Sequence, residues 1–155
     1  MLNCFLDEHA GLKGARVLDL GCGTGVVGVL LALLNKDILV TCSDLSTAAT
    51  ICTIKNAQNN QVQGKVQVTN GYGASHFRDA SFTHVLLNPP IRAGNEVVFQ
   101  LIKGAARVLC PKGQLYMVVR VKQGGKRLAE LAKEWFEFVE RVGRKKGFLV
   151  YRLVK

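Results

Sequence analysis

The feature that most constrains the fold is the segment Val17–Gly28, which reads VLDLGCGTGVVG. An apolar run with a carboxylate near its end leads into glycines at every second position, and a second apolar run follows. This order is typical of a buried strand, a tight turn and the start of a helix. Glycine has no Cβ, so the backbone of such a turn approaches a ligand closely, and the free N–H groups of the following helix point at the same place. The segment therefore predicts a binding loop for a small molecule.

The rest of the chain alternates short apolar runs with segments of helical periodicity. Five strands are predicted, at residues 16–20, 38–43, 66–69, 82–87 and 115–119. Two further strands, at residues 138–142 and 148–154, predict a closing hairpin around residues 143–147. The pattern indicates the α/β class: a doubly wound, mostly parallel, seven-stranded, Rossmann-like sheet with an antiparallel strand in the C-terminal hairpin and ligands at its carboxyl edge. With 155 residues, the chain is expected to form a single domain over residues 1–155.

Helix boundaries follow from capping and punctuation. Ser46 is predicted to cap the helix that follows the second strand. The helix ahead of the fifth strand is expected to stop at the segment CPKG, residues 110–113. Leu128, Ala132 and Phe136 predict a last helix, with Trp135 and the phenylalanines in the core.

Cysteine usage and hydropathy limit the compartment. The five cysteines are an odd set without a C-x-x-C pair or nearby His spacing, which argues against a disulfide framework and structural zinc and favours buried, reduced thiols. No apolar run is long enough to span a bilayer, and acids stand at the N-terminus where a signal peptide needs basic residues. We therefore expect a soluble, cytoplasmic protein without a metal site or membrane contact.

The net charge of +10 is unevenly distributed. Residues 1–102 hold seven Lys or Arg and seven acids, whereas residues 103–155 hold fourteen Lys or Arg and four acids, so the whole excess lies in the C-terminal third. Such asymmetry is typical of a protein that binds a polyanion, because neutralised phosphates release counterions. A solvated basic face explains the same pattern, so the charge alone leaves both interpretations open.

Two cofactors compete for the glycine loop. Residues 23–28 satisfy G-x-G-x-x-G, and Asp44 lies near the distance at which dinucleotide folds have a ribose-binding acid. Asp19, however, is a carboxylate two residues before Gly21, which would repel a pyrophosphate but attract a ligand that carries an ammonium and a sulfonium. An Asn-Pro-Pro sequence that starts at Asn88, directly after the fourth strand, also favours the second kind of ligand.

These motifs resemble those of class I S-adenosylmethionine-dependent methyltransferases: DLGCGTG at residues 19–25, the acid Asp44, and NPPI at residues 88–91. The longer segment NPPIRAG, with VRVKQGG at residues 119–125 and the closing hairpin, is similar to small-domain methyltransferases that modify guanine N2 in ribosomal RNA. The resemblance covers nearly the whole chain. It implies S-adenosyl-L-methionine as the cofactor and ribosomal RNA, or a ribosomal subunit, as the partner. The N-terminal extension of that family is expected to be largely absent here.

The resemblance also implies the cofactor-binding residues. They come from the glycine loop, the ends of the second and third strands and the Asn-Pro-Pro motif, and are Asp19, Gly21, Cys22, Gly23, Gly25, Asp44, Leu45, Asn70, Gly71, Tyr72 and Asn88. The glycines would approach the methionine part, Asp19 would fix the loop or its ammonium, and Asp44 would accept hydrogen bonds from the ribose hydroxyls. A bare turn is the alternative for the glycines, and a helix cap is the alternative for Asp44.

Asn88, Pro89, Pro90 and Ile91 would form the catalytic group. An exocyclic amine on a base is a poor nucleophile because its lone pair is delocalised into the ring. If the Asn88 side-chain oxygen and the Pro89 carbonyl each accept one of its N–H bonds, the lone pair is aimed at the methyl group and the developing charge is stabilised. Ile91 stands where many amine methyltransferases have an aromatic residue, which counts against a DNA adenine or a protein glutamine as the target. A plain strand-ending turn remains the alternative.

Basic residues after the fourth, fifth and sixth strands would surround the same edge of the sheet. They are Arg92, Arg120, Lys122, Lys126, Arg127, Arg144, Lys145 and Lys146. This basic rim would hold RNA phosphates while the pocket takes an unstacked base. The sequence thus predicts an N-methyltransferase acting on guanine N2 in ribosomal RNA. Methylation of another amine, in a protein glutamine or a small molecule, and a non-catalytic cofactor- or RNA-binding module are the alternatives.

Overall fold

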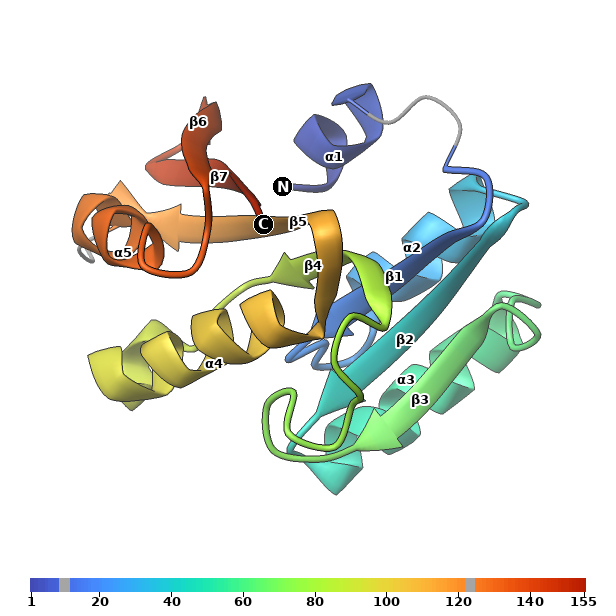
Figure 1. The fold of residues 1–155 in the computed structure, drawn as a ribbon. Coiled ribbons are helices and arrows are strands. Elements are labelled where there is room, and N and C mark those ends of the chain that lie inside the picture. Colours follow the sequence, from blue (N-terminus) through green and yellow to red (C-terminus); the bar gives the residue numbers. More distant parts are fainter. Residues whose placement is uncertain (9–11, 122–124) are drawn as a thin grey trace.

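The chain folds into a seven-stranded sheet with helices on both faces (Figure 1). The computed structural model describes residues 1–8, 12–121 and 125–155. The elements follow in the order α1 (Leu2–Glu8), β1 (Ala15–Leu20), α2 (Val26–Leu34), β2 (Ile38–Asp44), α3 (Thr47–Asn59), β3 (Val66–Asn70), β4 (Phe82–Leu87), the 3-10 helix η1 (Ile91–Ala93), α4 (Asn95–Val108), β5 (Leu109–Arg120), α5 (Gly125–Ala132), β6 (Phe138–Lys145) and β7 (Phe148–Val154).

The strand order is β3-β2-β1-β4-β5-β7-β6. The first five strands are parallel, and β7 runs antiparallel to both of its neighbours, β5 and β6. This confirms the predicted doubly wound sheet with an antiparallel strand in its terminal hairpin. Phe148, the first residue of β7, pairs with Arg120 at the end of β5 and with Lys145 at the end of β6. The β6–β7 turn therefore lies at the carboxyl edge, together with the ends of β1 to β5.

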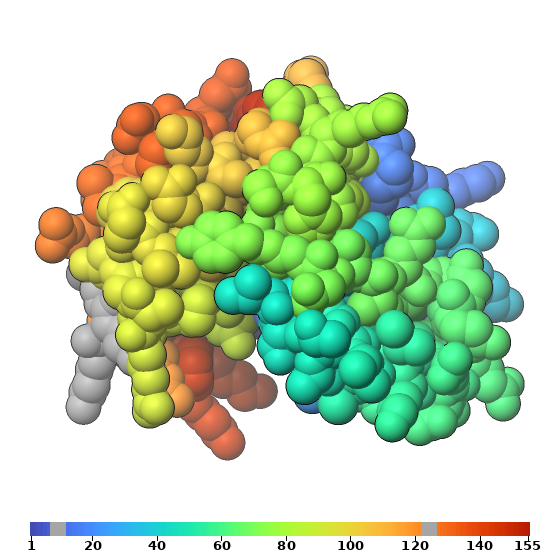
Figure 2. Space-filling view, turned by 90° about the horizontal axis from the view of Figure 1, so that it is seen from below, coloured from blue at the N-terminus to red at the C-terminus, as the bar shows by residue number. Residues whose placement is uncertain are grey.

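Two separate apolar clusters cover the two faces of the sheet. α1, α2 and α3 pack on one face, where Phe5, Leu31 and Tyr116 are fully buried. α4 and α5 pack on the other face around Ile102 and Leu115. In a view from below, α3 (teal) and α4 (yellow) flank the light-green connection between β3 and β4 (Figure 2). Within the described part of the chain, no helix has the length and apolarity needed to cross a membrane.

Two predicted boundaries are wrong, one at the start of β5 and one at the end of α5. β5 begins at Leu109 rather than at residue 115, because the CPKG segment is absorbed as an irregularity: Phe82 pairs with Leu109, and the next pair joins residues 84 and 114. Lys112 has a φ of +62° there, and its N–H donates to the Lys155 carbonyl at 2.9 Å. α5 ends at Ala132, so residues 135 and 136 follow the helix although their spacing continues its pattern.

The C-terminal hairpin is tighter than predicted. β6 runs on to Lys145, and the turn consists of Lys146 and Gly147, with φ of +47° and +81°. Positive φ at both positions is the requirement of a two-residue type I′ turn. Phe138 is 66% exposed and Phe148 is 37% exposed, so these two phenylalanines lie outside the core, contrary to the prediction.

The cysteines are all free thiols. Cys42 is buried, but Cys52 on α3 is exposed and Cys4, Cys22 and Cys110 are only partly buried, so the prediction of five buried thiols is confirmed for Cys42 alone. Among the residues that the structure describes, no group of three or more His, Cys, Asp or Glu side chains is arranged to hold a metal ion.

Candidate active site

A cavity of about 230 Å³ opens at the carboxyl edge of the sheet. The ends of β1, β2 and β4, the loop after β3 and one side of α4 contribute its walls, which are Leu20, Gly21, Ser43, Asp44, Leu45, Gly71, Tyr72, Gly73, Asn88, Pro90, Val97 and Leu101. Seven of these residues are among the predicted cofactor or catalytic residues. The remaining predicted residues of those two sets, Asp19, Cys22, Gly23, Gly25, Asn70, Pro89 and Ile91, do not line it.

Backbone hydrogen bonds pin the glycine loop to the end of β2. The N–H groups of Gly21 and Cys22 both donate to the Ser43 carbonyl, at 2.8 and 3.0 Å. At the end of the loop, Gly25 has a φ of +75°, and a Cβ on it would lie 2.4 Å from Cγ2 of Thr53 on α3. Only glycine combines that backbone conformation with that close approach.

Asp19 lies behind the loop and ties β1 to α2. Its Oδ2 accepts a hydrogen bond from the Gly28 N–H at 3.1 Å, and its side chain is 4% exposed. Burial raises the pKa of Asp19 to about 7, against the opposing effect of the Gly28 hydrogen bond and with a smaller contribution from the charge of Asp44. This hydrogen bond is compatible with the loop-fixing role, one of the two roles expected for Asp19.

Asp44 joins the loops around the cavity. Its Oδ2 accepts from the Gly23 N–H at 2.8 Å and its Oδ1 accepts from the Ser46 N–H at 2.9 Å. A carboxylate has about four acceptor positions, so each oxygen retains one, and Asp44 lines the cavity. The cap of α3 is Ser46, whose Oγ accepts from the Ala49 N–H at 3.3 Å, as predicted. The alternative of Asp44 as the helix cap is therefore wrong.

Asn70 braces this arrangement from outside the cavity. Its Nδ2 donates to the carbonyls of Asp44 and Leu45, at 3.1 and 3.0 Å, and the Gly71 N–H donates to the same Asp44 carbonyl at 3.0 Å. The Asn70 side chain, predicted as a cofactor-binding residue, thus holds the β2–α3 turn in position.

Sequence reasoning missed Ser43. Its side chain is 1% exposed, it lines the cavity, and its Oγ has no hydrogen-bond partner among the described residues. A buried hydroxyl without a partner costs roughly 1–3 kcal/mol, so this atom is suited to a polar group of a ligand. Val97 and Leu101, which form the apolar wall contributed by α4, were missed as well. The only available signal for Ser43 was a polar residue in an apolar strand directly before the acid.

The Asn-Pro-Pro segment forms a turn that its sequence did not reveal. Asn88 is exposed at the end of β4, and no described residue hydrogen-bonds to its side chain. The Ile91 N–H donates to the Pro89 carbonyl at 2.9 Å, and Pro90 has φ −75° and ψ +78°. These values define an inverse γ-turn centred on Pro90. One acceptor position of the Pro89 carbonyl is therefore already used, and one remains.

The described members of the basic rim are exposed around this edge. Arg92 lies on η1, Arg120 ends β5, and Arg127 lies on α5. The others that are described, Arg144, Lys145 and Lys146, belong to the β6–β7 hairpin. Arg120 stacks over the Phe148 ring with its guanidinium carbon 5.0 Å from the ring centre. Lys122 and the side chain of Lys126 lie outside the described residues.

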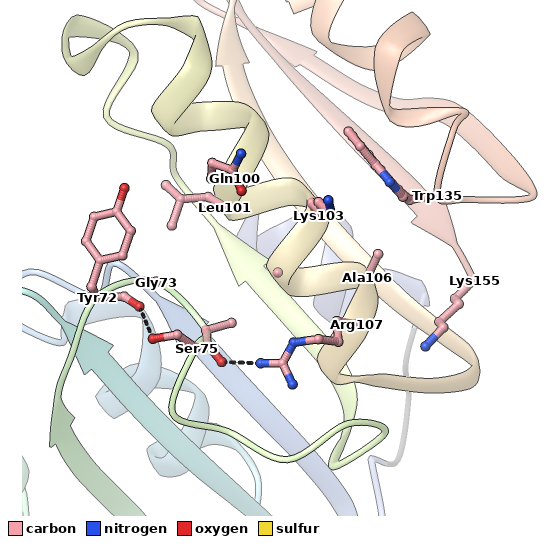
Figure 3. Close-up of a pocket in the computed structure, with 12 residues that line it drawn as sticks. Tyr72, Gly73, Ser75, Gln100, Leu101, Lys103, Ala106, Arg107, Trp135 and Lys155 are labelled. Carbon is pink, nitrogen blue, oxygen red and sulfur yellow. Dashed lines mark hydrogen bonds between the residues drawn. The ribbon is translucent and has the colours of Figure 1, made fainter.

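A second cavity of about 510 Å³ runs along α4 (Figure 3). It shares Tyr72, Gly73 and Leu101 with the first cavity and extends to Trp135. The Arg107 guanidinium is engaged there in holding the β3–β4 connection, because it donates to the carbonyls of residues 74 and 77 and pairs with Asp79. The second cavity adjoins the strand ends without including them.

A glycine loop after β1, an acid at the end of β2 and Asn-Pro-Pro after β4, on a sheet of this topology, define a class I, S-adenosylmethionine-dependent methyltransferase. The model of the methyltransferase small domain matches residues 1–152, and the chain belongs to that family.

Two relatives are similar to this chain over most of its length. The chain is 34% identical over 149 residues to the uncharacterised protein YbxB of Bacillus subtilis, a match that covers 96% of this chain and 73% of that protein. It is 31% identical over 150 residues to the ribosomal RNA large subunit methyltransferase G of Photobacterium profundum, which covers 92% of this chain and 39% of that protein. The chain thus spans well under half the length of that ribosomal RNA methyltransferase.

One solved structure has a fold similar to that of this chain. A T. thermophilus 16S rRNA methyltransferase in complex with AdoMet and guanosine superposes with a TM-score of 0.78 at 23% identity, over 97% of this chain and 37% of that one. At this identity the likeness concerns the fold.

Proposed function

We propose that this chain transfers a methyl group from S-adenosylmethionine to the exocyclic N2 amine of a guanine in ribosomal RNA. The observation that carries the proposal is the meeting of Asp44 and Asn88 in one cavity at the carboxyl edge. Exposed basic residues follow β4, β5 and β6 at the same edge of the sheet. The names of the relatives, which include ribosomal RNA methyltransferases, support the choice of RNA.

The cavity residues suit the parts of the cofactor. Asp44 has two free acceptor positions for ribose hydroxyls, and the partnerless Ser43 hydroxyl lies beside it. Leu45, Val97 and Leu101 offer apolar surface to an adenine ring. Bound there, S-adenosylmethionine supplies a methyl group that is already activated by its sulfonium.

The chain then has to orient an amine and accept its protons. The Asn88 side chain is free of described partners, and the Pro89 carbonyl keeps one acceptor position beside its bond to the Ile91 N–H. Two acceptors fixed by a γ-turn would hold both N–H bonds of an amine and aim its lone pair into the cavity. No strong base is needed, because the proton becomes acidic as the nitrogen gains positive charge.

The deciding experiment is methyl transfer from labelled S-adenosylmethionine to undermodified ribosomal RNA, followed by nucleoside analysis. We expect N2-methylguanosine with the native chain, and a loss of at least about 100-fold in rate with Asn88→Ala. Asn59→Ala, at the exposed end of α3, is the matched control and should keep full activity. Undiminished transfer by Asn88→Ala would refute the mechanism. Methylation of another amine would favour the second class of substrate, and cofactor binding without any transfer would favour a non-catalytic module.

The basic rim has its own test. The double variant Lys145→Gln/Lys146→Asn should weaken RNA binding and reduce the slope of log affinity against log salt by about 2, without changing cofactor affinity. Asn suits residue 146 because its φ is positive. The control removes two exposed lysines elsewhere, Lys36 and Lys55. An unchanged salt slope would exclude the rim from RNA binding.

A further inference from the structure

The second cavity lies where one crossover of the sheet contains no helix. The parallel connections β1–β2, β2–β3 and β4–β5 contain α2, α3 and α4, whereas residues 71–81, between β3 and β4, form only turns and irregular structure. The cavity of about 510 Å³ lies between this helix-free connection and α4, and Trp135 and Lys155 close its far end (Figure 3). Its volume is ordinary for a site that takes a small molecule or one unit of a polymer.

The walls of this cavity offer aromatic and aliphatic surface. Trp135 is only half-buried: its ring packs edge-to-face on Phe99, with ring centroids 6.1 Å apart, and it also lines the cavity. Tyr72, which is 55% exposed, and Leu101 stand at the opposite end, as Figure 3 shows. An aromatic ring of a ligand can stack on such walls.

The charged part of the lining is positive. Lys103, Arg107 and Lys155 line the cavity, and none of the described lining residues is acidic. Arg107 is already engaged in holding the β3–β4 connection. The exposed Lys103 ammonium forms no hydrogen bond or ion pair with any described residue, and the Lys155 ammonium donates one of its three hydrogen bonds, to the Leu109 carbonyl at 2.7 Å. Two ammonium groups therefore have donors left for an anion.

We propose that the second cavity binds a nucleotide of the RNA other than the one that is methylated, with its base against Trp135 and its flanking phosphates on Lys103 and Lys155. This inference rests on the proposed function. A base joined to phosphates combines the two chemistries that these walls match, because aromatic side chains stack on bases and lysines neutralise phosphates.

The position of the cavity favours an RNA strand over a smaller ligand. Tyr72, Gly73 and Leu101 line both cavities, so the second adjoins the candidate active site. A strand whose guanine enters the first cavity gains affinity by placing another nucleotide in the second, because the two are covalently linked, whereas a free nucleotide lacks that gain. An acidic peptide would match the lysines but not the stacking surface.

Trp135 is the single tryptophan of the chain, so its fluorescence reports on this cavity. The probe is a short single-stranded oligouridylate, added to the whole chain without cofactor. We expect it to quench Trp135 fluorescence over the same concentrations at which a labelled form binds by anisotropy. Lys103→Glu should raise the Kd by about tenfold. Lys55→Glu makes the same charge change at an exposed residue of α3 and should raise it by at most about twofold.

The aromatic wall has a separate test. Trp135→Leu keeps an apolar side chain beside Phe99 but removes the stacking ring, so the Kd measured by anisotropy should rise by about tenfold. Trp135→Phe retains a ring and should bind within about threefold of the native chain. If Trp135→Leu fails to fold, Lys103→Glu still decides, because it changes an exposed side chain.

Binding by anisotropy without quenching would overturn the proposal, and so would equal Kd values for Lys103→Glu and Lys55→Glu. Uridine monophosphate or oligoglutamate that quenches Trp135 with the affinity of the oligouridylate would overturn it too, by assigning the cavity to a free nucleotide or an acidic peptide. Methyl transfer has no part in these measurements. A chain that methylates RNA without the quench refutes this inference alone, and a chain that shows the quench but transfers no methyl group refutes the proposed function alone.

Discussion

The buried carboxylate behind the glycine loop should make the stability of this protein fall as pH rises. The pKa of Asp19 is about 7 in the folded chain, against an ordinary value of 3.8. Between these values the folded state keeps a proton that the unfolded state has released. Stability is therefore highest below about pH 4, falls as pH rises, and stops changing above about pH 7. From about pH 5 to pH 8 the loss amounts to about 3 kcal/mol, at roughly 1.4 kcal/mol per unit.

Asp19→Asn tests this directly. The amide oxygen can still accept the Gly28 N–H, but the side chain carries no titrating proton. Relative to the native chain, we expect the free energy of unfolding of the variant to increase by about 3 kcal/mol between pH 5 and pH 8, which corresponds to a relative shift of the thermal midpoint on the order of 10 °C.

Urea unfolding of both proteins at the two pH values measures the difference, and an unchanged m value would show that the denatured state is the same. Asp37→Asn, at an exposed acid, is the control and should show no such difference. Parallel pH profiles for Asp19→Asn and the native chain would refute the reasoning. Cofactor affinity measured on the same samples separates the two roles expected for Asp19. If Asp19 only fixes the loop, the Asn variant should keep its cofactor affinity, whereas a contact with the cofactor's ammonium would make that affinity fall.

Three further substitutions follow from the geometry. Ser43→Ala removes a partnerless buried hydroxyl, so it should leave urea stability unchanged or slightly raised while calorimetry shows cofactor binding about fivefold weaker. Gly25→Ala should cost about 3 kcal/mol in urea unfolding, and adding Thr53→Ala should recover the steric part but not the cost of the positive φ. Phe5→Ala should cost roughly 3–5 kcal/mol, because its buried ring packs edge-to-face on Tyr116; a loss below 1 kcal/mol would mean that α1 adds little to the fold.

The sequence predicted the elements best where apolar runs end at polar residues. β4 has the predicted bounds, Phe82–Leu87, because the apolar residues 85–87 end sharply at Asn88. The start of β5 was missed because Pro111 reads as a break, whereas a hydrogen bond to the C-terminal strand carries the sheet through it. At Trp135 the error was the opposite one, because the sequence predicted a regular element that continues beyond its actual end. Trp135 follows α5 in a turn, where it packs against Phe99 and the core at a spacing that a longer helix would also give.

In the candidate site, too, some residues could be predicted from the sequence and others could not. Motif residues such as Gly21 and Asn88 could be predicted because they directly follow strands, and the ends of parallel strands meet at the edge where the cavity lies. Val97 and Leu101 could not be identified in this way, because an apolar residue on a helix faces either a cavity or the core, and only packing decides which. The γ-turn at Pro90 was equally hidden, since two successive prolines are compatible with several turns.

The position of Asp44 explains how loops from three strands form one site. Its carboxylate holds the glycine loop through Gly23 and the start of α3 through Ser46, while its carbonyl receives both the Asn70 side chain and the Gly71 N–H. Every one of these bonds has a backbone group as a partner, so the arrangement needs few particular side chains. A carboxylate whose loops are already held in this way can offer its remaining acceptor positions without reorganising, which is the condition for binding a pair of hydroxyls tightly. The acid that the sequence motif predicts for ligand recognition therefore also holds the loops of the cavity together.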